Sequence, residues 1–203
     1  AGGEPVPVLG YCMGGTLAAA LAVLRPDHIA ALVLLAAPWD FHVDAAGISV
    51  GPPPALAAAR PALENLIDTL GYLPVDALQA MFMSIDPLQG WTKFQSFAAV
   101  PVESPAAETF VALEDWLNDG VPLAGDVARA CLFGWYGAND PARGNWVVAG
   151  QTIDPHQIGC PALGVVPAQD RIVPPASARA LIDAISGAKS LSPNAGHIGM
   201  MMG

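Results

Sequence analysis

Three short apolar runs along the chain have the pattern of strands that are buried on both faces of a parallel sheet. They span residues 6–9, 29–36 and 161–166, and the second of them contains no polar residue. Continuous apolar runs, as opposed to alternating ones, are typical of parallel strands covered by helices on both sides. A further short strand is expected near residues 189–191. The pattern therefore predicts a parallel sheet.

Helical patterns separate these runs. Residues 16–24 are rich in alanine and leucine and end at Arg25-Pro26, where a helix is expected to stop. Further helices are expected over residues 122–136 and 177–185. From Val6 to Ala36 the chain thus reads as strand, tight turn, helix and strand, which is a βαβ unit.

The segment 41–121 has a different texture, with many prolines and no convincing strand. Helices are expected at residues 57–70, 75–84 and 106–118. Helical insertions of this kind in α/β enzymes often form caps over the site. The expected organisation is an α/β core at residues 1–40, a helical cap insertion at 41–121 and the remaining α/β core at 122–203.

Composition sets the class of protein and limits its partners. Apolar residues make up 53% of the 203 residues and charged residues 13%, which suits one domain with a substantial core. The longest apolar run, Ile29 to Trp39, is shorter than the roughly 18 residues that a membrane span needs. No signal-peptide pattern opens the chain. The formal net charge of −10 disfavours nucleic acid and anionic membranes as partners.

The three cysteines, Cys12, Cys131 and Cys160, match neither a disulfide framework nor a zinc site in number or spacing. This usage favours a reducing, cytoplasmic compartment. Cys131 and Cys160 are expected to pack in the core.

The strongest chemical signal is the G-x-C-x-G sequence from Gly10 to Gly14, between the first strand and the first helix. A sharp turn there holds a nucleophile in a strained conformation, and its small neighbours let strand and helix approach. Cys12 would lie at the positive end of the helix dipole, which favours a thiolate. The Met13 N–H would face a developing oxyanion. The alternative is that Cys12 is only a small residue buried in a glycine-rich turn.

An acid and a histidine follow in the order that a nucleophile elbow requires. Asp170 comes after the strand at 161–166, and His197 comes after the next strand. Both stand on loops at the C-terminal ends of strands, where ligands gather in open parallel sheets. In such a triad the histidine is the base and the acid orients it. Taken singly, Asp170 could be a solvated turn residue or a partner of Arg171, and His197 an exposed loop residue.

Two further residues, Trp39 and His42, are candidates for a substrate pocket because they follow the strand at 29–36, close to the expected site. His28 and His156 are expected at the surface, and the scatter of these histidines gives no metal site.

The run from Gly10 to Thr16 resembles the lipase-like box of polyhydroxyalkanoate synthases, in which cysteine replaces serine. Further segments, spread over nearly the whole chain, are similar to the same family, and the segments 71–83 and 86–88 are similar to its short class III members. All the family-like segments are residues 34–41, 71–83, 86–88, 110–119, 170–174 and 196–198.

The resemblance implies an α/β-hydrolase-like parallel sheet, here its C-terminal portion, with a helical cap insertion. It implies an acyltransferase that polymerises 3-hydroxyacyl-CoA through Cys12, Asp170 and His197, with a covalent acyl-cysteine and with Met13 in the oxyanion hole. Acyl-CoA is then a substrate, no cofactor is required, and the growing polyester is the product. A synthase partner subunit and a homodimer are both compatible with the family, and the implied location is the cytoplasm or the polymer-granule surface.

Two other functions stay open. One is a cysteine-dependent hydrolase of thioesters, esters or lactones that uses the same triad. The other is a non-catalytic, granule-associated relative. Water access separates a polymerase from a hydrolase, and no motif reports it.

The chain departs from the family pattern at both ends. The first strand begins almost at Ala1, where the family has preceding strands, and the chain stops just past His197, where a closing helix is expected. Pro5 and Pro7 also conflict with a central position for the first strand. We therefore expect a fragment that is poorly soluble or oligomeric, and nearly inactive, by itself.

Overall fold

The computed structural model describes residues 3–85 and 87–202, so Asp86, in one of the family-like segments, lies outside the described residues. The chain forms two compact units. Unit 1 comprises Ala1–Ala58 and Ala130–Gly203, and unit 2 comprises Ala59–Arg129.

The boundaries of unit 2 differ from the expected bounds of the helical insertion, residues 41–121. Residues 41–58 belong to unit 1, where the Phe41 N–H donates to Asn139 Oδ1 at 2.9 Å. Residues 122–129 belong to unit 2, where the Gly125 N–H donates to the Gly71 carbonyl at 2.9 Å. Long-range hydrogen bonds of this kind are not visible in local composition.

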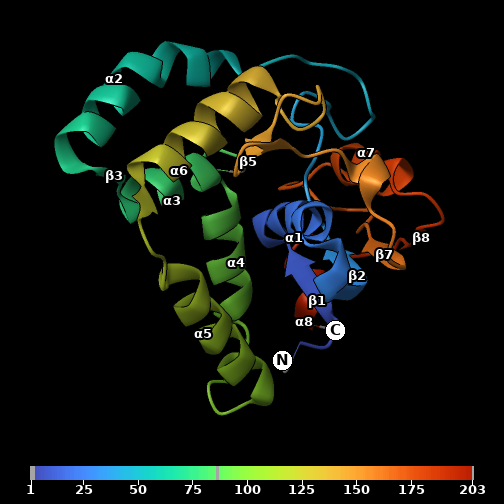
Figure 1. Cartoon of the computed structure of the whole chain (residues 1–203). Coiled ribbons are helices and arrows are strands. Elements are labelled where there is room, and N and C mark those ends of the chain that lie inside the picture. Colours follow the sequence, from blue (N-terminus) through green and yellow to red (C-terminus); the bar gives the residue numbers. More distant parts are fainter. Residues whose placement is uncertain (1–2, 86, 203) are drawn as a thin grey trace. The chain divides into compact units, whose positions relative to one another are not determined.

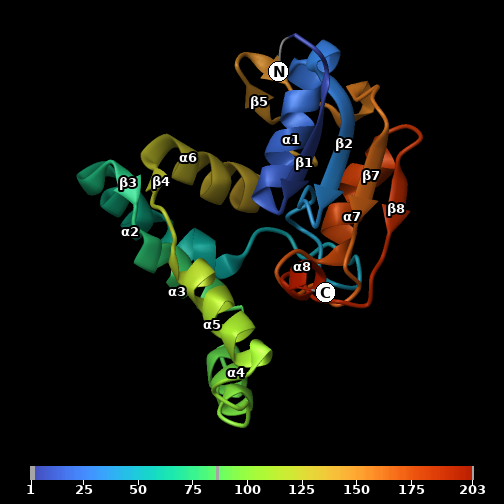
Figure 2. The same cartoon turned by 90° about the horizontal axis from the view of Figure 1, so that it is seen from below.

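Unit 1 is built on a four-stranded parallel sheet, as predicted. The strand order is β1 (Val6–Tyr11), β2 (Ile29–Leu35), β7 (Ala162–Val165) and β8 (Lys189–Leu191), and the strands run in one direction (Figure 2). Their C-terminal residues are in register across the sheet. The loops that follow β1, β7 and β8 therefore emerge at the same end of the sheet, where the strands have their C-termini.

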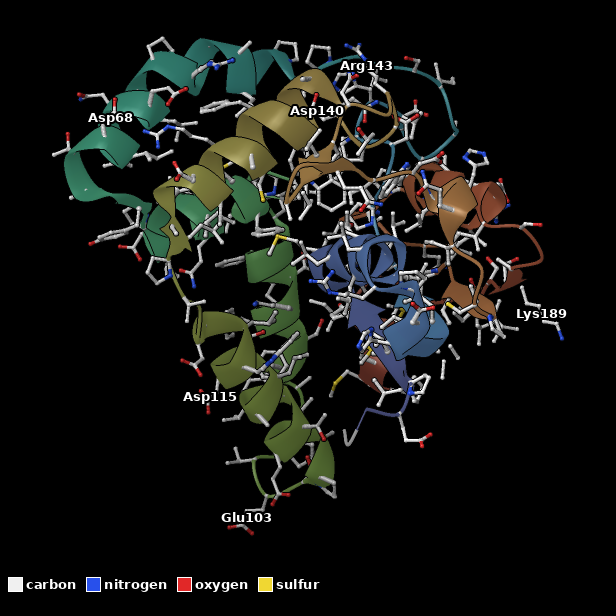
Figure 3. The ribbon with its side chains drawn as sticks, viewed as in Figure 1. Asp68, Glu103, Asp115, Asp140, Arg143 and Lys189 are labelled. Atoms are coloured by element: carbon white, nitrogen blue, oxygen red, sulfur yellow. The ribbon has the colours of Figure 1, made fainter. Side chains whose placement is uncertain are left out.

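β1 is an edge strand of this sheet within the described residues. It pairs only with β2, and its Leu9 side chain is 61% exposed. An edge strand tolerates proline because one row of its N–H groups has no strand to bond to. Pro5 lies just before β1, and Pro7 lies within it. At the opposite edge, Lys189 of β8 projects outward into solvent (Figure 3).

Helix α1 (Met13–Leu24) packs on β1 and β2, and α7 (Pro175–Ala184) packs on β7. The close approach of α1 depends on small residues. A Cβ on Gly15 would lie 2.4 Å from the Ala37 Cβ. Further elements of unit 1 are η1 (Pro26–His28), β5 (Val147–Val148), β6 (Gln151–Thr152), η3 (Pro155–Gln157) and α8 (Gly199–Met202).

Unit 2 is mainly helical, as predicted, and its elements are coloured from teal through green to olive in Figure 1. They are α2 (Pro54–Leu70), whose first residues lie before the unit boundary, β3 (Tyr72–Leu73), α3 (Val75–Met83), α4 (Gln89–Phe97), α5 (Pro105–Asn118), β4 (Leu123–Ala124) and α6 (Gly125–Arg129). Two expectations were wrong. α4 was missed, because Gly90, Thr92 and three aromatic residues give it a low helix propensity. β3 and β4 form a short antiparallel pair where no strand was expected.

The helix expected over residues 122–136 is only partly correct. Its first residues form β4, and the helix then continues as α6 and as the π-helix η2 (Ala130–Ala138), which belongs to unit 1. Within the described part of the chain, none of the helices combines the length and apolar character needed to cross a bilayer.

Candidate active site

Cys12 occupies a sharp turn between β1 and α1, as the G-x-C-x-G sequence predicts. Its backbone has φ 54° and ψ −128°, a conformation that few non-glycine residues adopt. The turn is possible only because Gly10 lacks a side chain. A Cβ there would lie 2.4 Å from the Gly14 carbonyl oxygen and 2.5 Å from the Gly15 Cα.

Backbone hydrogen bonds hold the turn in place. The Cys12 N–H donates to the Leu35 carbonyl at 2.8 Å, and the Cys12 carbonyl accepts from the Gly15 N–H at 2.8 Å. Met13 is the first residue of α1, so its N–H is one of the first-turn amides that cannot bond within the helix. An oxyanion that forms beside Cys12 would meet this amide and the positive end of the helix dipole.

Asp170 is buried in the loop after β7, with its two carboxylate oxygens used differently. Oδ1 accepts from the N–H groups of Ile172 and Val173 at 2.9 and 2.8 Å, which fixes the carboxylate. Oδ2 accepts from Nδ1 of His197 at 2.6 Å. Asp170 is therefore not a solvated turn residue, and its remaining oxygen orients an imidazole.

His197 is also buried, with its side chain 7% exposed, so it is not a loose loop residue. Burial lowers the pKa of His197, but hydrogen bonds with Asp170 and with Cys12, together with their negative charges, raise it to about 9. Because Nδ1 is bound to Asp170, Nε2 is the nitrogen left for the Cys12 thiol. The structure thus brings together Cys12, Asp170 and His197, three residues that are far apart in the sequence.

Trp39 and His42 are placed differently from the expectation of a substrate pocket. Trp39 is buried in the core and packs edge-on against Trp146 at a centroid distance of 5.9 Å. His42 is buried as well, and its Nε2 lies 2.9 Å from the Tyr136 carbonyl oxygen. Both side chains are therefore buried and make contacts within the protein interior.

Two tyrosines near the triad were missed by sequence reasoning. The Tyr11 ring stacks on the His197 imidazole at a centroid distance of 4.9 Å. Burial raises the pKa of Tyr136 to about 12, with smaller contributions from the charges of Cys12 and Cys131. The position of Tyr11 beside Cys12 was a usable signal, whereas nothing local distinguishes Tyr136.

The other cysteines lie where they were expected. Cys131 is buried in η2, its Sγ is 3.9 Å from Met13 Sδ, and burial raises its pKa to about 11. Cys160 is half-buried just before β7, and burial raises its pKa too. His28 and His156 are exposed, as expected.

We expect Cys131→Ala and Cys160→Ala to change stability more than chemistry. Removal of a buried thiol costs about 1 kcal/mol, whereas neither residue belongs to the triad. Urea unfolding and acylation assays on the two variants would check this. A variant with normal stability and abolished acylation would contradict it.

No metal site is apparent among the described residues, which contain no group of three or more His, Cys, Asp or Glu side chains able to hold an ion. Two cavities of about 400 Å³ each lie within unit 2. One is lined mainly by α5. The other borders the ion pair between Arg129 and Asp68 of α2.

The triad geometry allows a direct test of the Asp170 role. Asp170→Asn removes the charge that favours a protonated imidazole while burial remains, so the pKa of His197 is expected to fall well below 9. The raised pKa stabilises the native protein below about pH 6.5, and this stabilisation is lost as the pH rises through 9. That pH dependence is expected to disappear in the variant.

NMR titration of His197 and urea unfolding at pH 6 and pH 10 would measure both effects. Asp154→Asn is the matched control, because Asp154 pairs with the exposed His156 at 2.7 Å. It should leave the His197 titration unchanged. A His197 pKa that stayed near 9 in Asp170→Asn would show that the carboxylate is not the main cause of the raised pKa.

Comparison with known proteins gives the family context. Residues 1–203 match the family model described as alpha/beta hydrolase fold. The chain is 29% identical over 201 residues to a poly(3-hydroxyalkanoate) polymerase subunit PhaC of Synechocystis, with 97% of this chain and 53% of that protein covered. It is 30% identical over 206 residues to the protein of the same name from Allochromatium vinosum, with 98% and 55% covered. The expected resemblance is therefore confirmed, and the chain spans about half the length of these relatives.

Solved structures agree on the fold. An enol-lactonase from Burkholderia xenovorans is 18% identical with a TM-score of 0.50, covering 99% of this chain and 62% of that one. A monoacylglycerol lipase from Paleococcus ferrophilus is 17% identical with a TM-score of 0.53, covering 96% and 61%. At this identity the likeness concerns the fold alone.

Proposed function

Since the chain belongs to the alpha/beta hydrolase fold family, we propose that it is the catalytic part of a polyhydroxyalkanoate synthase-type acyltransferase with Cys12 as nucleophile. Two observations support this proposal. One is the similarity to the poly(3-hydroxyalkanoate) polymerase subunits. The other, which carries the proposed mechanism, is the buried Asp170–His197 pair, whose histidine is hydrogen-bonded with Cys12 at the elbow.

The first half-reaction acylates the cysteine. Nε2 of His197 takes the proton of the Cys12 thiol, and the thiolate attacks the thioester carbonyl of a 3-hydroxyacyl-CoA. The Met13 N–H stabilises the oxyanion. The carbon–sulfur bond to coenzyme A then breaks, the coenzyme A thiolate receives the proton from His197, and the acyl group remains on Sγ. One thioester replaces another, so the step is close to balanced in energy.

The second half-reaction extends the polyester. His197 takes the proton from the hydroxyl of a second 3-hydroxyacyl unit, and that oxygen attacks the acyl-cysteine carbonyl. An ester bond forms, the bond to Sγ breaks, and Cys12 regains its proton from His197. Cysteine suits this step because a thioester is reactive toward alcohols and departs as a stabilised thiolate. Neither half-reaction requires a cofactor, and acyl-CoA is the substrate.

Formation of the acyl-cysteine is the direct test. The purified protein is incubated with 3-hydroxybutyryl-CoA, release of coenzyme A is followed, and the site of modification is determined by peptide mass spectrometry. We expect one 3-hydroxybutyryl group on Cys12 even where turnover by these 203 residues alone is low, because a single acylation is detected by mass without turnover. Cys160→Ser should acylate normally, because it removes a half-buried thiol outside the triad. Acylation at Cys160, or none at Cys12, would contradict the proposal.

The fate of the acyl group separates the synthase from the hydrolase. A synthase yields oligomeric 3-hydroxybutyrate esters, whereas a hydrolase yields only free 3-hydroxybutyrate at the same rate as coenzyme A. A protein that binds polyester granules but never acylates Cys12 would correspond to the non-catalytic alternative.

A further inference from the structure

The side chain of Tyr11 makes two separate contacts with the proposed base. Its ring stacks on the imidazole of His197 at a centroid distance of 4.9 Å with an interplanar angle of 29°. Its hydroxyl donates to the backbone carbonyl of the same residue at 3.1 Å. One side chain thus fixes both the ring plane and the backbone of His197.

Other hydrogen bonds hold the His197 loop to the acid loop. The Ala168 N–H donates to the Pro193 carbonyl at 2.9 Å, and the Gln169 N–H donates to the Ala195 carbonyl at 3.0 Å. With the Asp170 contact, these bonds make the acid and the histidine one rigid group. They do not set the distance from that group to the nucleophile.

Tyr11 supplies the connection to the nucleophile, because it is the last residue of β1 and the residue before Cys12. β1 in turn is held to β2 in register through Tyr11 and Leu35. The path from Cys12 to His197 through Tyr11 therefore contains one peptide bond and one side chain. Such a short path is stiff, and small errors in the position of a base are costly to proton transfer.

We propose that Tyr11 is a positioning residue that holds the His197 imidazole at the distance and angle which proton transfer from Cys12 requires. This inference rests on the proposed function, in which His197 is the base.

The chemistry of Tyr11 suits this role. Burial raises its pKa, and the negative charges of Cys12 and Asp170 raise it further, so the phenol keeps its proton and remains a donor. Asp170, Cys12 and the Tyr11 ring all face His197. A ring face next to a protonated imidazole stabilises the positive charge that arises when Cys12 gives up its proton.

Two substitutions separate the roles of hydroxyl and ring. Tyr11→Phe keeps the ring and removes the donor to His197, and Tyr11→Leu removes both. Tyr72→Phe is the matched control, since Tyr72 is an exposed tyrosine of β3. Three readouts are measured: NMR titration of His197, one of four histidines; the rate of Cys12 alkylation by iodoacetamide; and the rate of acylation by 3-hydroxybutyryl-CoA.

For Tyr11→Phe we expect the His197 titration to stay close to wild type and acylation to slow roughly 3- to 10-fold, the effect of one lost hydrogen bond. For Tyr11→Leu we expect His197 to titrate at a lower pH and acylation to slow roughly 10- to 100-fold. A residue that only supports the fold would lower the unfolding midpoint without changing any of the three readouts in the folded protein.

A folded Tyr11→Leu with wild-type titration and rates would overturn the inference. If Tyr11→Leu does not fold, Tyr11→Phe decides. An unchanged acylation rate in Tyr11→Phe overturns the positioning role of the hydroxyl. If the wild-type protein forms no acyl-cysteine at all, the proposed function fails. The His197 titration and the alkylation rate still decide the role of Tyr11 in that case.

Discussion

Replacement of Cys12 by serine is expected to reduce acyl transfer from 3-hydroxybutyryl-CoA by about a thousandfold or more. The substitution changes one atom, so the elbow and the Asp170–His197 pair should persist. A serine hydroxyl is a far weaker acid than a thiol, whose ordinary pKa is about 8.5. Transfer of its proton to His197 is correspondingly unfavourable, and the leaving group of the second half-reaction becomes an alkoxide.

Coenzyme A release and the mass of the acylated peptide would measure this loss. Cys160→Ser is the matched control, because it makes the same atomic change at a cysteine outside the triad. Circular dichroism should show that both variants are folded. Undiminished turnover in Cys12→Ser would rule out Cys12 as the nucleophile. The fold assignment would then stand without the proposed mechanism.

Gly10→Ala is expected to have the largest effect on stability, about 3 kcal/mol or more. The new Cβ would lie 2.4 Å from the Gly14 carbonyl oxygen, 2.5 Å from the Gly15 Cα and 2.8 Å from the Gly14 carbonyl carbon. All three are backbone atoms of the first turn of α1, so no side-chain rotation relieves the contact. The turn must open, and the contact of α1 with β1 is lost with it.

Gly14→Ala is the control, four residues away in the same motif. A Cβ there meets nothing within 4 Å, and alanine in the first turn of a helix is neutral or stabilising by up to about 1 kcal/mol. Urea unfolding followed by circular dichroism would measure both midpoints. Equal midpoints for the two variants would show that the elbow is looser than its geometry indicates.

Local sequence was enough to predict the sheet and to single out Cys12, Asp170 and His197, which the structure brings together. The apolar runs that became β1, β2 and β7 are bounded by glycine and proline, and the alanine-rich run that became α1 ends at Arg25-Pro26. Cys12, Asp170 and His197 each follow a strand. The strands are parallel and in register at their C-terminal ends. A residue that follows a strand is therefore brought to the same end of the sheet as the others. Strand ends and turn residues are local features, and so they are readable in the sequence.

Other features were decided only by the tertiary structure. Trp39 and His42 follow β2, as a site residue would. Trp39 nevertheless packs in the core, and His42 contacts the Tyr136 carbonyl. The contact between Tyr11 and His197 joins residues 186 positions apart. Burial and hydrogen-bond partners depend on which elements pack together, and that choice is made by the whole chain and leaves no periodic pattern. The sequence thus predicted which residues the structure would bring together, whereas packing determined that Tyr11 contacts His197 and that Trp39 and His42 lie buried.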